Sequence, residues 1–561
     1  MRISFRINQV CSTRGALKVV SAGAYRVALL LLSSAIFLVH AHGQSADGAS
    51  APAKLAASPE QGPAQPKAES PKKEERPVTD REKTLLERID LLEKRLAEVE
   101  SLVNKTSAPP AIESTKTPTD LAANTTSSAP SIEPAQDQPP KKKKAEPFAF
   151  ADWTWLSGNP RTKEVPLDSK FFTPEIRFDV NYTSSFNHPQ DNTIGGSSEI
   201  FRSGEFQLTQ LGLGGDFHYD NVRGRFMTQI GMYSQTQPRN DPSTARGQWQ
   251  LDNAYRYISE AYGGYHIDKM HGINVDAGIF LSYIGLWSFY NFDNWTYQPS
   301  FVSSNTPWFF NGLRVQIFPS DKLKIEPWLI NGWQSYGKFN KAPGIGGQIA
   351  WRPNSKVAFV FNNYWGKDTL NNPDRKRIHT DDSVQVKYYD NQDKWLSKGA
   401  FTFTLDAGCE YGGGVSCSGD PGRPAQYFLG FMAYNRFWFK KDQFALTLGG
   451  GAITNPGRYL VLLPPINGAT AFSGTPYFTA NPGDQFRGID GSVTFDYMPS
   501  QYITFRGEYN HRASNVPYWS GRGGITPVGG NFGPPGSFVP GFTPDLVKQE
   551  RRFTLAILVK Y

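Results

Sequence analysis

From residue 171 to its end, the chain alternates apolar and polar side chains in stretches of about ten residues, the length with which a tilted strand crosses a membrane. Successive side chains of a β-strand point to opposite faces, so this period of two predicts strands with one apolar face. In the last strand, Leu558 is the one exception to the alternation. Its apolar set is Phe553, Leu555, Ile557, Val559 and Tyr561, and its polar or small set is Arg552, Thr554, Ala556 and Lys560. Such a strand either covers a protein core or faces lipid.

The same pattern recurs elsewhere, as at residues 176–182 and 503–509, and about sixteen strands fit between residues 171 and 561. Their connections alternate between short and long. The short ones are YDNVRG, DKMHG, PSDK, PNSK, DNQDK, KKDQ and PSQ, and the long ones include residues 286–308, 455–483 and 515–542. This rhythm predicts an all-β fold, a closed antiparallel up-and-down transmembrane β-barrel. A soluble β-sandwich is the alternative, but it has shorter strands and does not predict the alternating connections.

Residues 1–43 have the features of an export signal. Residues 1–26 carry five basic residues and no acid, residues 27–39 are apolar, and Ala41 and Gly43 offer a cleavage site of small residues. The apolar stretch is short for a membrane span, and a retained membrane anchor is the alternative. No cysteine directly follows this stretch, so lipoprotein processing is not expected.

Between this signal and the barrel, expected at residues 146–561, the sequence predicts a coiled coil flanked by two disordered spacers. Residues 44–78 are rich in Ala, Pro, Ser, Lys and Glu, and residues 105–145 are rich in Pro, Thr and Ser. Residues 79–104 carry apolar side chains at spacings of three and four, which predicts a coiled coil. The flanking charges Arg88, Arg95, Glu93 and Glu100 match across a parallel oligomer. The seam consists of Leu85, Ile89, Leu92, Leu96, Val99 and Val103. A helix packed elsewhere on the protein is the alternative.

Composition and charge exclude some partners. Aromatic residues make up 14% of the chain and charged residues 20%, with 53 glycines and 41 prolines, which suits a protein with many turns. The formal charge of +8 includes the five basic residues of the signal. The remaining charge is too weak and too dispersed to indicate nucleic-acid binding.

No catalytic or metal-binding arrangement stands out. The eight histidines show no metal-ligand spacing, and the glycine-rich runs at 411–414 and 521–524 lie in long loops, so no metal, cofactor or enzymatic reaction is expected. After removal of the signal, Cys409 and Cys417 are the only cysteines. Export to an oxidising compartment favours a disulfide between them, and two free thiols are the alternative.

Two stretches, FADWTWLSGNPRTK (150–163) and NFDNWTYQPSFVSSNTPWFFNGLRVQIFP (291–319), resemble the Putative beta-barrel porin-2 family of outer-membrane channels. The terminal Tyr561 also resembles the C-terminal signature of outer-membrane proteins. The resemblance covers residues 146–561. It implies a porin-like channel in a Gram-negative envelope and does not identify the solute.

In a barrel of about sixteen strands, the polar faces surround an aqueous channel. Strand parity places a mixed set of charges on this inner face, and we expect them to line the pore, with pairing that only stabilises the wall as the alternative. This set comprises Arg177, Asp179, Arg223, Arg225, Arg314, Glu326, Asp490, Asp496, Arg506, Glu508 and Arg512. Because both signs are mixed, no strong ion preference is expected.

The third long loop, residues 286–308, is rich in aromatic residues and has a single charged residue. In porins the third loop commonly folds inward, so the resemblance implies a constriction. The expected constriction residues are Trp287, Tyr290, Phe292, Asp293, Trp295 and Tyr297. Their rings would either stack on sugars or aromatic solutes, or pack the loop onto the wall or a neighbouring subunit.

Three functions are consistent with this sequence. The first is a passive porin for small hydrophilic solutes, the second is a selective channel for sugars or oligosaccharides, and the third is an envelope tether or adhesin anchored by a barrel. The expected partners are outer-membrane lipid, the solutes, and further copies of the chain, with a trimer favoured. The cell wall is a further expected partner, reached by a coiled-coil stalk in the periplasm.

Overall fold

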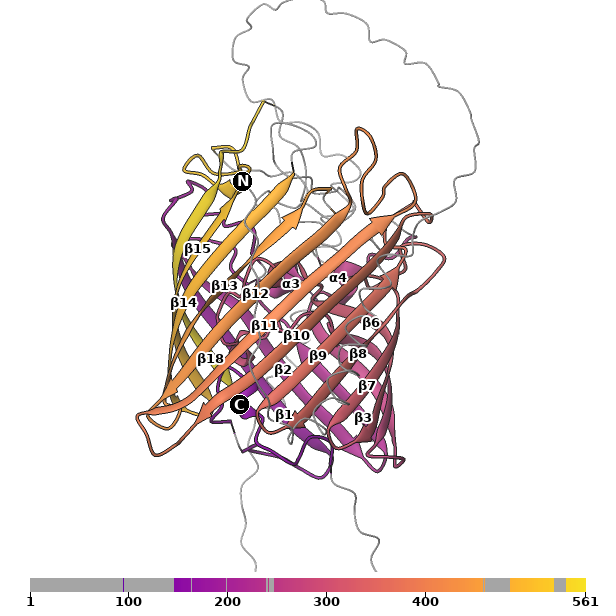
Figure 1. Ribbon diagram of the computed structural model, residues 1–561, viewed down its shortest axis with the longest axis vertical. Helices are drawn as coiled ribbons and strands as arrows, with labels where there is room; N and C mark the ends of the chain where they lie inside the picture. Colours follow the sequence, from indigo (N-terminus) through magenta and orange to yellow (C-terminus); the bar gives the residue numbers. More distant parts are fainter. Residues whose placement is uncertain are drawn as a thin grey trace, which may run out of the picture. The chain divides into compact units, whose positions relative to one another are not determined.

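The computed structural model describes Lys94 and residues 146–162, 164–197, 199–238, 241, 247–457, 459, 485–528 and 541–561. In this part of the chain, sixteen strands form one closed antiparallel barrel (Figure 1). The prediction of a closed up-and-down barrel of about sixteen strands is therefore confirmed. The alternating stretches form strands because a strand directs its apolar side chains to one face and its polar side chains to the other, so both sets reach a suitable environment.

Each strand pairs with its neighbours along the chain, and the barrel closes where β1 pairs with β18, with Arg177 opposite Lys560. The strands are β1 (Phe172–Ser185), β2 (Phe206–Tyr219), β3 (Val222–Thr228), β4 (Ile258–Ile267), β5 (Ile273–Leu281), β6 (Phe309–Ser320), β7 (Leu323–Ile330), β8 (Gly344–Asn354), β9 (Val357–Gly366), β10 (Lys376–Asp390), β11 (Leu396–Tyr411), β12 (Tyr427–Phe439), β13 (Phe444–Asn455), β14 (Phe486–Ser500), β15 (Ile503–Ser514) and β18 (Gln549–Lys560).

The two rims of the barrel differ. Short turns follow β2, β4, β6, β8, β10, β12 and β14, and longer loops follow β1, β3, β5, β7, β9, β11, β13 and β15, so all short turns lie on one rim (Figure 1). In outer-membrane barrels the short turns face the periplasm. The remaining elements are short: η1 (Thr154–Leu156), α3 (Tyr233–Thr236), α4 (Leu251–Tyr255), η4 (Asn291–Asp293), η5 (Ser303–Asn305), and the pair β16 (Trp519–Ser520) and β17 (Leu546–Val547). None of the described helices is long and apolar enough to span a membrane.

The outer face of the wall is apolar. On β18, Phe553 and Leu555 point outward and are 43% and 53% exposed, a surface that suits lipid rather than water. Leu558, the exception in the alternating pattern, is fully buried on the inner face. It packs with Phe292 and Tyr297, which belong to a loop inside the barrel.

Aromatic rings also contact one another on the outer face beside the short turns, as expected for side chains at a membrane interface. These ring pairs are Phe172 with Phe217, Trp395 with Phe439, Phe444 with Tyr497, and Tyr502 with Tyr561. The outer wall therefore combines an apolar band with an aromatic border at the short-turn rim.

The N-terminal expectations lie outside the described residues. Of residues 1–145, the structure describes only Lys94. The signal at 1–43, both spacers and the coiled coil at 79–104 therefore stay predictions. In the barrel, Cys409 at the end of β11 forms a disulfide with Cys417 in the following loop.

Candidate functional site

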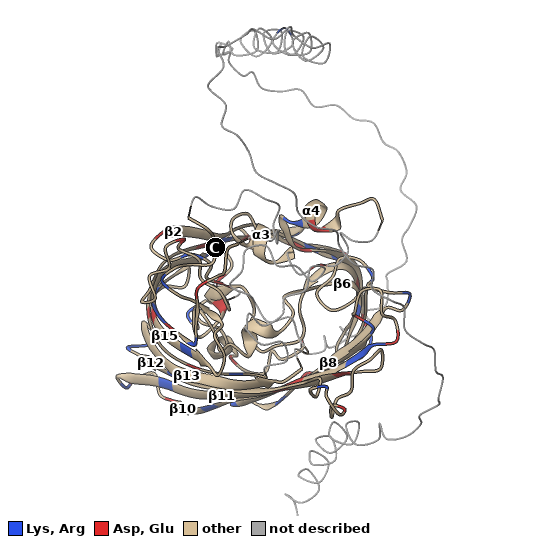
Figure 2. Ribbon diagram, turned by 90° about the horizontal axis from the view of Figure 1, so that it is seen from above, with Lys and Arg blue, Asp and Glu red and all other residues tan. Residues whose placement is uncertain are grey.

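The loop between β5 and β6, residues 282–308, crosses the interior of the barrel, and we call it the inner loop. In the closed ring of sixteen strands, β6 and β14 are eight positions apart, the largest separation possible. Residues 291–301 of the inner loop nevertheless form hydrogen bonds with side chains of β12, β14 and β15. The loop must therefore reach from one side of the barrel to the other, and Figure 2 shows chain inside the ring of strands.

Arg506 on β15 holds the inner loop by its backbone. Its Nη1 donates to the carbonyl oxygens of Asn291 (2.9 Å) and Thr296 (2.8 Å), and its Nη2 donates to that of Asn294 (2.8 Å). The guanidinium is also paired with Asp496 on β14, with Nε 2.6 Å from Oδ1. Arg506 and Asp496 are both buried, so this pair is shielded from water.

Two further buried arginines add to this arrangement. Arg436 on β12 donates to Trp295 O at 2.9 Å, and Arg512 on β15 donates to Pro299 O at 2.7 Å. Arg436 also lies 2.7 Å from Asp496, so this single carboxylate pairs with two arginines. The three arginines together satisfy carbonyl groups that an irregular loop cannot satisfy by itself.

Carboxylates of the wall accept hydrogen bonds from the amide groups of the same loop. Glu508 on β15 accepts from the backbone nitrogens of Tyr297 (2.7 Å) and Gln298 (2.9 Å). Asp490 on β14 accepts from the backbone nitrogen of Phe301 at 2.8 Å. The wall therefore supplies both donors and acceptors to the backbone of the inner loop, which fixes its course across the lumen.

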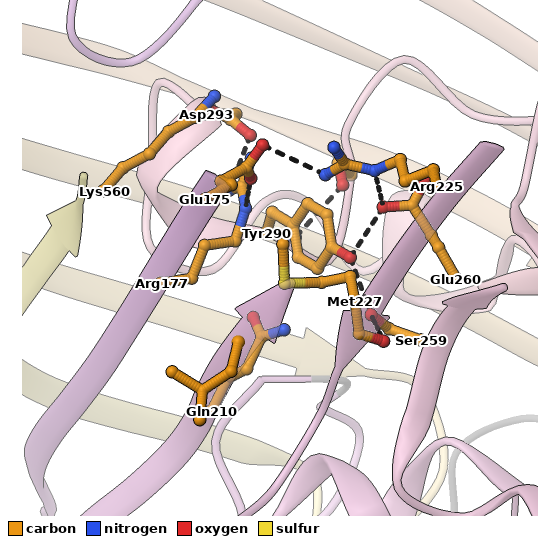
Figure 3. Close-up of polar contacts among 12 residues, drawn as sticks. Glu175, Arg177, Gln210, Arg225, Met227, Ser259, Glu260, Tyr290, Asp293 and Lys560 are labelled. Carbon is orange, nitrogen blue, oxygen red and sulfur yellow. Dashed lines mark hydrogen bonds and ion pairs between the residues drawn. The ribbon is translucent and has the colours of Figure 1, made fainter. Parts of the chain in front are cut away.

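Asp293, the single charged residue of the inner loop, is bound near β1 (Figure 3). Its carboxylate oxygens lie 2.8 Å from Arg177 Nη1 and 3.4 Å from Lys560 Nζ. Burial opposes the ionisation of this carboxyl, but the charges of Arg177 and Lys560 outweigh the effect and hold the pKa of Asp293 below its usual range. The Arg177 guanidinium also lies 4.0 Å from the ring centre of Tyr290, whose hydroxyl donates to Glu260 at 2.9 Å.

The aromatic rings of the inner loop are buried between the loop and the wall. The buried rings include Trp287, Tyr290, Phe292, Trp295 and Tyr297. Trp295 packs edge-on against Trp438 with a centroid distance of 5.5 Å, and Tyr297 donates its hydroxyl to Asp179 at 2.8 Å. A solute would find no open ring face at Trp295 or Tyr297, so the geometry gives no support to sugar stacking there.

The charges predicted to line the pore lie on the inner face and fall into two groups. The first group contacts the inner loop or lies beneath it, and it comprises Arg177, Asp179, Asp490, Asp496, Arg506, Glu508 and Arg512. The second group lies on β3, β6 and β7 and comprises Arg223, Arg225, Arg314 and Glu326. A pore-lining role remains a prediction for both groups.

Charged residues of the second group form ion pairs with charges of opposite sign. Asp276 on β5 lies between Arg223 and Arg314, at 3.4 and 3.0 Å. The Arg223 side chain is 29% exposed, whereas Asp276 is fully buried. Lys324 pairs with Glu326 at 2.9 Å and is also the more exposed partner. In these pairs, the basic group is therefore the one that is accessible from the lumen.

The sequence did not single out Arg436, although it binds the inner loop as directly as Arg506. The alternation on β12 could have indicated this contact, because Tyr434, Arg436 and Trp438 share the inward face. An inward arginine between two inward aromatic residues indicates a packed contact rather than open water. Asp276 was also missed, because its strand is only nine residues long.

Among the described residues, no group of three or more His, Cys, Asp or Glu side chains is placed to hold a metal ion. The interior instead combines a clamped loop with accessible charges, and the exterior combines an apolar band with an aromatic border. These features define a membrane-embedded barrel of the porin type.

The chain belongs to the family described as Putative beta-barrel porin-2, OmpL-like, whose model matches residues 178–533. The resemblance seen in the sequence is thus confirmed. This family and the fold point to an outer-membrane channel rather than an enzyme. No match was found among curated proteins.

Several solved structures are similar to this chain. OmpT, an outer membrane protein of Vibrio cholerae, is 9% identical with a TM-score of 0.39, covering 71% of this chain and 100% of that chain. An anion-selective porin from Comamonas acidovorans is 10% identical with a TM-score of 0.40, covering 70% and 99%. OprB of Pseudomonas putida is 9% identical with a TM-score of 0.40, covering 70% and 94%.

Proposed function

We propose that this protein is a passive porin, a water-filled channel through which small hydrophilic solutes diffuse across the outer membrane. A barrel of sixteen strands is wide enough to leave an aqueous interior. The inner loop crosses this interior and narrows it, because it is bound to the wall on the far side of the ring.

The observation that carries this proposal is the exposure of charged side chains inside the barrel. Arg223 on the wall is 29% exposed, and Asp293 on the inner loop is 27% exposed, although both are ion-paired. Charged groups that retain this exposure on the inner face of a lipid-embedded wall must be hydrated. The mixed signs along this surface favour hydrophilic solutes in general over one class of ion.

Planar-bilayer recording of the purified protein tests the proposal, together with swelling of liposomes that contain it. A passive porin gives stable conductance steps proportional to voltage, and swelling rates that fall smoothly with solute size. A barrel that serves only as an anchor for a tether or adhesin would give neither steps nor swelling. Graded rates among solutes of equal size would instead favour a selective channel.

We extend the proposal to assembly through the predicted coiled coil, residues 79–104. Its heptad pattern supports a parallel oligomer. In this proposal the oligomer is a trimer, and the coiled coil is a periplasmic stalk that reaches towards the cell wall. Deletion of residues 79–104 is expected to reduce the oligomer seen in native electrophoresis. An unchanged oligomer in the deletion variant would remove the coiled coil from assembly.

A further inference from the structure

The segment that precedes β1 crosses the short-turn mouth of the barrel along a diameter. We call residues 146–162 the strap, which Figure 1 shows in indigo at the lower end of the barrel. At one end, Phe148 N donates to Asp321 O in the β6–β7 turn at 2.7 Å. At the other end, Thr162 Oγ1 donates to Gln501 O in the β14–β15 turn at 3.2 Å. These two turns are eight positions apart in the ring of sixteen strands.

The strap is fixed on both sides of the mouth. On the β8 side, the Arg352 guanidinium lies 4.6 Å from the ring centre of Trp153, close enough for a cation–π contact. On the opposite side, Arg161 Nη1 donates to Met498 O at 2.6 Å, and Asn159 is fully buried against β14 and β15. A segment attached at both ends in this way cannot swing clear of the mouth as a free tail would.

The middle of the strap also supports the inner loop from below. Gly158 N donates to Asp293 O at 2.8 Å, and Trp295 Nε1 donates to Trp155 O at 3.3 Å. Arg436 joins the two segments, because it donates to Gly158 O at 2.7 Å and to Trp295 O at 2.9 Å. The strap and the inner loop are therefore packed as one unit on the same arginine of the wall.

We infer that the strap is a second constriction of the channel and the support that positions the inner loop, so that it helps to set the largest solute that passes. This inference rests on the proposed passive channel. A linker that only had to deliver the chain to β1 would need no contact with the β6–β7 turn, which lies on the far side of the ring from the β14–β15 turn. Here the chain instead places its residues across the opening through which a solute must pass.

Gly158 offers a direct test, because its backbone contacts the inner loop closely. A Cβ at this position would lie 2.2 Å from Asn294 O and 2.5 Å from Phe292 O, and backbone oxygens cannot turn away as a side chain can. Gly158→Ala should therefore separate the strap from the loop. The matched control is Gly263→Ala on β4, where a Cβ meets no atom within 4 Å.

Planar-bilayer conductance, and the swelling of liposomes in solutes of increasing size, are measured for the full-length protein and both variants. Folding is followed by heat-modifiable migration in electrophoresis. Gly158→Ala is expected to shift the single-channel conductance and the solute size limit upward, and Gly263→Ala to leave both unchanged. Asn159→Ala combined with Arg161→Ala, which releases one end of the strap without a clash, should shift both in the same direction.

Folded strap variants with unchanged conductance and size limit would overturn the inference and leave the channel proposal intact. Failure of both strap variants to fold, with Gly263→Ala folded, would also overturn it, because the strap would then serve the folding of the barrel rather than the passage. An unmodified protein that gives no current at all would refute the channel proposal itself.

Discussion

Replacement of Arg506 by alanine should release the inner loop while the barrel stays folded. This side chain binds three carbonyl groups of the loop, those of Asn291, Asn294 and Thr296, at 2.8 to 2.9 Å. Its ladder neighbours on β14 and β18 pair through backbone groups, which the substitution leaves in place. Asp496 loses one of its two arginines but keeps Arg436 at 2.7 Å, so it is not left as an isolated buried charge.

The magnitude follows from the hydrogen bonds that are lost. A hydrogen bond to a charged group contributes about 1.5–3 kcal/mol, so three would give roughly 4.5–9 kcal/mol if nothing replaced them. Water from the lumen will satisfy some of the freed carbonyl groups, and we expect a net loss of about 3–5 kcal/mol. Each 1.4 kcal/mol is a factor of about ten in population, so states in which the loop has left the wall should become at least about a hundred times more frequent.

Single-channel recording in planar bilayers measures this effect directly. Arg506→Ala should give larger conductance steps and stronger open-channel noise than the unmodified protein, because the loop moves within the passage. Arg551→Ala is the matched control, since Arg551 is exposed on the outer side of β18 near the long loops. Steps and noise equal to those of the control, in a variant that migrates as a folded barrel, would refute the view that this arginine holds the loop.

Three further outcomes are expected. Arg177 and Lys560 hold the pKa of Asp293 below its usual range, so the carboxylate stabilises the loop above about pH 3.9, and this stabilisation is lost as the pH falls through the lowered pKa. Open-channel noise should therefore rise only in strong acid. The Asp293→Asn variant should show this noise at every pH. Tyr297→Phe removes a donor to Asp179, which should loosen the loop by about 1–3 kcal/mol and lower the thermal stability, and an unchanged melting temperature would contradict this. Arg223→Ala removes an accessible positive charge worth about 1 kcal/mol to an ion some 4 Å away, so the reversal potential in a salt gradient should move toward cation selectivity by up to about fivefold in permeability ratio.

The barrel was predictable because each of its strands separates two solvents. Side chains of Phe553 and Leu555 must face lipid, and their neighbours Arg552 and Thr554 must not, so the period of two is stronger than in a soluble sheet. The same rule identified Leu558 as an exception without explaining it. The explanation lies in its contact with the inner loop, more than 250 residues earlier in the chain.

The interior was predictable only in part, because strand parity gives the direction of a side chain and not what covers it. Parity placed Arg506 and Glu508 inside, but both are buried by the inner loop rather than left open to water. The contacts that decide this join groups 215 and 211 residues apart. No local pattern contains a contact of that kind. The position of the strap was missed for the same reason. Its sequence motif indicated the family, but it contained nothing that predicts a course across the mouth of the barrel.

The contacts between the wall and the inner loop determine which residues can be substituted without moving the loop. Arg506 and Glu508 bind carbonyl and amide groups of the loop, and these groups are present whatever side chains the loop carries. Asp293 and Tyr297 are different, because they also contact the wall through their own side chains. Loop side chains that face the lumen can therefore change without loss of the backbone contacts, whereas a change in the wall arginines removes several contacts at once. Substitutions in the loop can thus change the selectivity of the channel, while the position of the loop depends on a few buried charges of the barrel.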